Sequence, residues 1–129
     1  MDILIRFGFS IEEINNMINS NEEINDISDS HIEDIIKILE EMGCGVNPIK
    51  NIFITNPFLL TREITEIKKL IVKLLDLGIE DLCFLFDSNP FLLNMDYKDV
   101  DSIVKSLSKD GYKKDDILDY FYYESNLIL

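Results

Sequence analysis

The sequence predicts an all-α protein, a short α-solenoid of about three to four helical-hairpin or triplet repeats. Three observations predict this fold class. Four glycines, Gly8, Gly43, Gly78 and Gly111, recur at intervals of 35, 35 and 33 residues. The pentapeptide Asn-Pro-Phe-Leu-Leu occupies positions 56–60 and returns 33 residues later at 89–93. After each of its prolines, apolar residues recur every seven positions, which places them on one face of a helix. Repeats of roughly 20–50 residues are typical of solenoids.

The glycines and prolines divide the chain into similar units. Each glycine follows an apolar run, with a leucine four positions before it, as expected of a residue that ends a helix in the left-handed conformation. Residues 1–7 therefore look like the tail of a helix. Proline cannot continue a helix interior, so Asn-Pro ends a shorter helix and begins a tight turn or a single helical turn. We expect one domain, 1–129, with units of approximately 1–42, 43–77, 78–110 and 111–129.

Helices are expected near 10–20, 29–42, 47–56, 61–77, 79–89, 96–109 and 113–123. Ser10 with Glu13, and Ser30 with Glu33, have the spacing of capping boxes. The other expected helix starts are Asn47-Pro48, Thr61 and Asp96.

The apolar residues seven apart are expected to form the core. From Pro57 the series is Leu60, Ile67 and Leu74; from Pro90 it is Leu93, Val100 and Leu107. In the first unit the same positions are Asn25, Ile32 and Leu39, with Asn25 replacing the first leucine. We expect five further apolar residues to widen this stripe: Ile64, Ile71, Leu75, Ile103 and Val104.

This pattern resembles the repeat of the mitochondrial transcription termination factor (mTERF) family. The family motif places one proline and three leucines at the spacing of Pro57, Leu60, Ile67 and Leu74, and the series from Pro90 matches it too. The first unit has Glu22 in place of the proline. The resemblance implies a left-handed superhelix of helical triplets whose basic concave groove binds duplex nucleic acid. It also implies an organellar protein with more units than this chain holds.

The charge of the chain favours a different partner. There are 25 acidic and 12 basic residues, a net charge of −13, which repels polyanions and favours basic partners. Residues 1–42 hold 11 acids and 2 bases, a net of −9. We therefore predict a non-enzymatic protein-interaction module whose acidic N-terminal face binds a basic partner. The residues expected to form this face are Glu12, Glu13, Glu22, Glu23, Asp26, Asp29, Glu33 and Asp34. The same acids also fit a solvated helix face, a mimic of nucleic-acid charge or a divalent-cation site.

The alternative prediction is an mTERF-like nucleic-acid-binding protein. Residues 43–77 are the one stretch with a positive balance, 5 bases against 3 acids. Its candidate phosphate contacts are Lys50, Arg62, Lys68, Lys69 and Lys73. Lys69 and Lys73 are four apart and share a helix face, where they also fit solvated residues paired with nearby glutamates.

No sequence motif indicates catalysis, a cofactor or a metal site. His31 is the one histidine and is expected on the surface, in the first turn of a helix. Cys44 and Cys83 are expected to be free thiols in a reducing compartment. The sequence favours a cytoplasmic protein, since no apolar run approaches the ~20 residues of a membrane span. The apolar end, 127–129, is expected either to fold back as a cap or to contact a partner or a second copy of the chain.

Overall fold

The computed structural model describes residues 2–123, and within this range every regular element is a helix, which confirms the all-α class. The elements, in chain order, are α1 (Asp2–Phe7), α2 (Ile11–Ser20), η1 (Glu22–Asp26), α3 (Asp29–Glu41), α4 (Val46–Thr55), η2 (Pro57–Thr61), α5 (Ile64–Asp76), α6 (Leu82–Ser88), η3 (Pro90–Asn94), α7 (Tyr97–Lys109) and α8 (Lys114–Tyr123). Here η denotes a short 3₁₀ helix.

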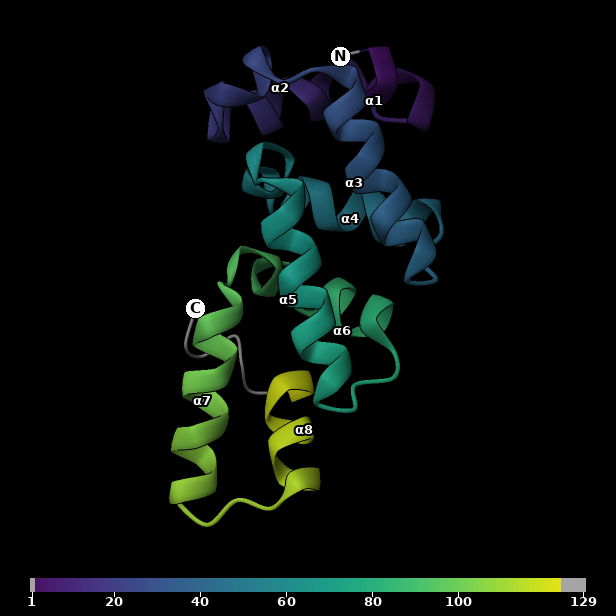
Figure 1. The fold of residues 1–129 in the computed structure, drawn as a ribbon. Coiled ribbons are helices and arrows are strands. Elements are labelled where there is room, and N and C mark those ends of the chain that lie inside the picture. The colour runs from purple at the N-terminus through teal and green to yellow at the C-terminus, as the bar shows by residue number, and fades with distance from the viewer. Residues whose placement is uncertain (1, 124–129) are drawn as a thin grey trace.

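The elements confirm the predicted repeat of a short helix, a single tight turn and a long helix. The turn at Asn-Pro is a 3₁₀ helix in the second and third units, and η1 forms at the same place in the first unit without a proline. Figure 1 shows the units following one another along an elongated molecule, with the long helices α3, α5 and α7 in a row. Helix α1 packs against α3, as the tail of a preceding long helix would.

The predicted glycine stops are also confirmed. Gly43 and Gly78 have φ of +92° and +97°, a left-handed conformation that a side chain would strain, and Gly8 and Gly111 share it. The amide of the residue after each glycine donates to the carbonyl of the leucine that stands four residues before the glycine, as in Ile79 to Leu74 at 3.3 Å. This closes the helix end and turns the chain into the next unit.

Two of the predicted helix starts are confirmed. Ser10 and Glu13 form the expected capping box, and Asp96 accepts the amide of Lys98. The other three were wrong. Ser28, not Ser30, caps α3, because its side chain accepts the amide of His31. Glu63, not Thr61, precedes the first residue of α5, and Thr61 is the last residue of η2. Helix α4 begins at Val46, so the residue before it is Gly45 and not Asn47.

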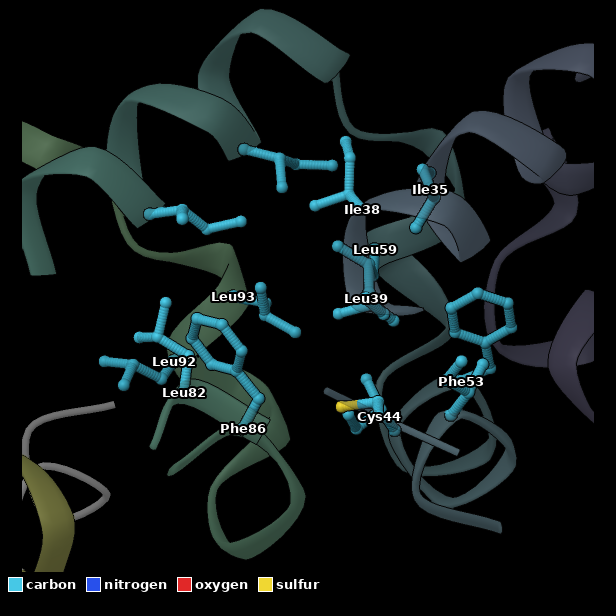
Figure 2. Close-up of a cluster of buried hydrophobic side chains, with 14 of the residues drawn as sticks. Ile35, Ile38, Leu39, Cys44, Phe53, Leu59, Leu82, Phe86, Leu92 and Leu93 are labelled. Atoms are coloured by element: carbon cyan, nitrogen blue, oxygen red, sulfur yellow. The ribbon is translucent and has the colours of Figure 1, made fainter. Parts of the chain in front are cut away.

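The apolar stripe forms a continuous core through the units. Leu60, Ile67 and Leu74 are buried, as are their counterparts Leu93 and Val100. Figure 2 shows side chains from α3, η2, α6 and η3 meeting in this core. Leu75 was wrongly placed in the stripe: it is 47% exposed, because the core-facing arc of α5 is centred on Leu70, Ile71 and Leu74.

The asparagine before each of the first two 3₁₀ helices links one unit to the next. Asn56 is fully buried, and its Nδ2 donates to the carbonyl of Pro90 at 3.0 Å and to Oδ1 of Asn94 at 2.9 Å. Asn94 returns a bond to Oδ1 of Asn56 at 3.0 Å. A buried amide must be hydrogen-bonded to avoid a large desolvation penalty, so these bonds define how the third unit sits on the second.

The same link recurs one unit earlier. Nδ2 of Asn21 donates to Oγ1 of Thr61 at 2.9 Å and to the carbonyl of Pro57 at 3.4 Å. Asn21 is buried, as is Asn89 at the equivalent place in the third unit. We call Asn21 and Asn56 the inter-unit asparagines.

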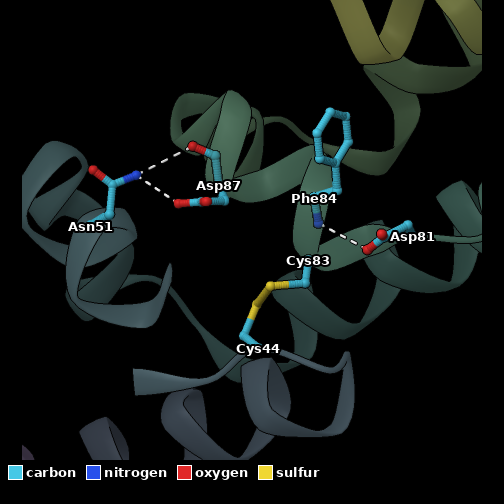
Figure 3. Close-up of a disulfide and its surroundings, with 6 residues drawn as sticks. All are labelled: Cys44, Asn51, Asp81, Cys83, Phe84 and Asp87. Carbon is cyan, nitrogen blue, oxygen red and sulfur yellow. Dashed lines mark hydrogen bonds between the residues drawn. A yellow bond between two sulfur atoms is a disulfide. The ribbon is translucent and has the colours of Figure 1, made fainter. Parts of the chain in front are cut away.

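Cys44 and Cys83 form a disulfide, which contradicts the predicted pair of free thiols (Figure 3). Cys44 follows the glycine that ends α3, and Cys83 lies in α6 of the next unit, with Cα atoms 5.3 Å apart. Close by, Nδ2 of Asn51 in α4 donates to the backbone carbonyl and to Oδ1 of Asp87 in α6. The second and third units are therefore joined covalently as well as by packing.

Candidate functional site

The predicted basic cluster of the second unit does not form one surface, because three of its members hold neighbouring units together. Lys50 donates to the carbonyl of Gly8 at 3.0 Å, lies 3.6 Å from Oε1 of Glu13 and sits 5.5 Å from the ring centre of Phe9. It thus fastens α4 to the turn between α1 and α2. The Lys50 side chain is only partly exposed.

Arg62 and Lys73 have similar structural partners in the third unit. Arg62 is partly buried and donates to the carbonyl of Leu93 in η3. Burial lowers the pKa of its guanidinium, against the attraction of Glu66 and Asp96, but the group stays charged. Nζ of Lys73 lies 3.0 Å from Oδ1 of Asp101 in α7. The side chains of Arg62 and Lys73 therefore both bond to the third unit.

Lys68 and Lys69 are exposed on α5. Within the described residues Lys68 has no ion pair. Nζ of Lys69 lies 3.5 Å from Oε1 of Glu66, an exposed pair of little energetic weight, and 5.6 Å from the ring centre of Tyr97 in α7. Lys69 therefore points toward the third unit.

Helix α7 carries a row of lysines that the sequence analysis missed. Lys98, Lys105 and Lys109 are exposed, and at 100° per residue they fall within about 40° of one another, opposite the buried Val100. The spacing of seven and then four residues spreads them over about 16 Å of helix axis. Nζ of Lys98 lies 5.9 Å from the ring centre of Tyr97, so this ring has Lys69 and Lys98 both beside it.

These residues define a basic surface formed by two adjacent long helices. We call Lys69, Lys98, Lys105 and Lys109 the lysine surface. Helices α5 and α7 are in direct contact, and Asp101, the carboxylate between them, is paired with Lys73. The helical spacing of the α7 lysines was visible in the sequence. The net charge of −4 over residues 78–110 concealed it.

The predicted acidic face extends over α2, η1 and α3. Six of its eight members are exposed, and Glu13 and Asp29 are partly buried. Glu13 belongs to the capping box of α2: the backbone amide of Ser10 lowers the pKa of the Glu13 carboxyl, and Lys50 lowers it further. Glu33 lies 3.5 Å from Lys37 in an exposed pair. The other five exposed members, Glu12, Glu22, Glu23, Asp26 and Asp34, carry their carboxylates at the solvent-exposed surface.

No group of three or more His, Cys, Asp or Glu side chains within residues 2–123 is placed to hold a metal ion. His31 is partly buried rather than on the surface, and its Nε2 has no hydrogen-bond partner in this part of the chain. No helix in the described range is long and apolar enough to cross a bilayer. The apolar end, 127–129, lies outside the described residues.

Comparison with known proteins gives one match. The family model described as mTERF matches residues 1–128, essentially the whole chain. No curated protein and no solved structure matches the chain.

Proposed function

The chain belongs to the mTERF family, and on this premise we propose that it binds nucleic acid, contacting phosphates through the lysine surface of α5 and α7. The family suggests a helical-repeat protein that binds nucleic acid. The observation that carries the proposal is the row Lys98, Lys105 and Lys109, exposed on one face of α7 and continued onto α5 by Lys69 across the ring of Tyr97.

The chemistry of this surface fits phosphate contact. Ammonium groups bind phosphates as point charges, and each contact releases counterions from the nucleic acid. Four such groups on two adjacent helices offer a compact footprint. The net charge of −13 opposes binding elsewhere, particularly at the first unit, so we expect contact to be confined to α5 and α7 and to be sensitive to salt. Of the basic cluster predicted from sequence, Lys69 is part of this footprint and Lys68 flanks it.

Replacing Lys98 and Lys105 with glutamate is expected to weaken binding to a 20-base-pair duplex by at least about 10-fold and to lower the salt slope of log K by about 2. Fluorescence anisotropy of labelled DNA and RNA duplexes, at several salt concentrations, measures both quantities. The matched control replaces Arg6 and Lys37, exposed cations of α1 and α3, with glutamate, so that net charge changes equally. Equal loss in both variants, or no binding by the wild-type chain at low salt, would refute the lysine surface.

A second candidate function rests on the acidic face, where residues 1–42 carry a net charge of −9 and most of the carboxylates are exposed. We propose that this face binds a basic protein. Replacing Glu22 and Glu23 with lysine should weaken binding to a poly-lysine probe by about 5-fold in isothermal titration calorimetry. The control replaces Asp76 and Glu80, exposed acids outside the first unit, with lysine. If the two variants lose affinity equally, only net charge is being measured and the face is not a site.

A further inference from the structure

The long helices present the same face to the helix that follows. In α3 this face consists of Ile35, Ile38 and Leu39, which are all buried and are labelled in Figure 2. In α5, 35 residues later, the equivalent positions are Leu70, Lys73 and Leu74. Both leucines are fully buried, and Lys73 pairs with Asp101 of the following helix. In the first two long helices, the next long helix thus packs against this face: α5 packs on α3, and α7 packs on α5.

In α7 this face is open among the described residues. Its equivalent positions are Ile103, Ser106 and Leu107, of which the apolar pair is only partly buried and Ser106 is exposed. These three residues line a hollow of about 370 Å³, together with Ser102, Asp110 and Tyr120. Figure 1 shows α7 as the last helix of the row. We call this hollow the α7 groove.

An acidic hollow continues the α7 groove at its C-terminal end. It measures about 480 Å³ and shares Asp110 and Tyr120 with the groove. Asp116, Asp119 and Tyr112 complete its polar lining. The combined surface is therefore apolar along α7 and carries three carboxylates at one end.

We propose that the α7 groove binds an amphipathic α-helix of a basic partner protein. The helix would place apolar side chains against Ile103 and Leu107 and lysine or arginine side chains over the acidic hollow. That the occupant is a helix follows from the repeat, since a long helix covers the same face of α3 and of α5. That it is basic follows from the charges of Asp110, Asp116 and Asp119.

The residues that differ between α5 and α7 support a basic occupant. Lys69 and Lys73 of α5 are replaced in α7 by Ser102 and Ser106, so the two lysines that α5 directs toward α7 have no counterpart among the residues that line the groove. A helix that presents a carboxylate as α7 presents Asp101 to Lys73 would find a serine, Ser106, at the equivalent place in the groove. A second copy of the chain is disfavoured as the occupant because of its negative charge. Its first unit carries −9, and its own acidic hollow would repel an identical one.

The probe is a fluorescent peptide with the sequence of residues 63–77 in which Glu63→Gln, Glu66→Gln and Asp76→Asn leave its three lysines as a net positive charge, because this helix packs on α3 in the chain itself. We expect saturable binding to the full chain in an anisotropy titration. Replacing Ile103 and Leu107 with aspartate should weaken that binding by at least about 10-fold. The matched control replaces Ile54 and Val72, apolar residues 42% and 55% exposed outside the groove, with aspartate and should bind as the wild type does.

Two further measurements distinguish the occupants. A peptide with Lys68→Glu, Lys69→Glu and Lys73→Glu should bind at least about 5-fold more weakly if the acidic hollow contributes. Binding only when Leu127, Ile128 and Leu129 of the full chain are replaced with aspartate would mean that the chain's own end occupies the groove. A dimer in sedimentation equilibrium that Leu107→Asp abolishes would assign the groove to a second copy. Either result, or no binding to the folded chain, overturns the proposal.

Discussion

Replacing Phe53 with alanine is expected to lower the free energy of unfolding by about 3–5 kcal/mol, the usual range for a fully buried phenylalanine. Phe53 is 0% exposed in the C-terminal half of α4, and its ring stacks on that of Phe9 at a centroid distance of 5.9 Å. Helix α4 packs against both α2 and α6, so the cavity would open where two units meet (Figure 2). Equilibrium denaturation in urea, followed by far-ultraviolet circular dichroism, measures the change.

The control for Phe53 is Phe58→Ala. Phe58 lies five residues further on, in η2, and is 50% exposed, so the same atoms are removed from a site that solvent already reaches. We expect a loss below about 1 kcal/mol. Comparable losses at the two positions would contradict the placement of the core between α4 and its neighbours.

Replacing Cys44 and Cys83 with serine is expected to destabilise the oxidised chain by about 4 kcal/mol, because their sequence separation of 39 corresponds to that chain entropy in the unfolded state. The same urea titration, run with and without a thiol reductant, measures it. The wild-type midpoint should fall in reductant toward that of the double variant, whose own midpoint should not move. If the urea midpoint of the wild-type chain is the same with and without reductant, the two cysteines are free thiols.

The repeat could be predicted from sequence because its signals are local. A glycine after an apolar run and an Asn-Pro before one act within a few residues, and so the helices begin and end close to where they were expected. The errors also have local causes. Ser28 and Ser30 are both good caps two residues apart, and only the course of the chain out of η1 decides between them. Leu75 is next to Leu74 in sequence, but it falls outside the core-facing arc of α5, which is centred on Leu70, Ile71 and Leu74.

The candidate site depended on contacts between units, which sequence spacing does not display. Lys50, Arg62 and Lys73 have the composition of a phosphate-binding cluster, yet each bonds to a neighbouring unit. The disulfide was missed for the same reason, since Cys44 and Cys83 meet only once the second unit is stacked on the third. The lysine row of α7 could have been found by counting helical positions residue by residue.

The inter-unit asparagines have a consequence for how the molecule unfolds. Because Asn21 and Asn56 each donate to the unit that follows, opening one unit strands buried polar groups in its neighbour. In a linear array, a strong penalty at each boundary raises the nearest-neighbour coupling relative to the intrinsic stability of one unit. Strong coupling makes a short array behave as a single cooperative block. Hydrogen exchange in α3, α5 and the helices between them should therefore proceed through one shared opening rather than unit by unit.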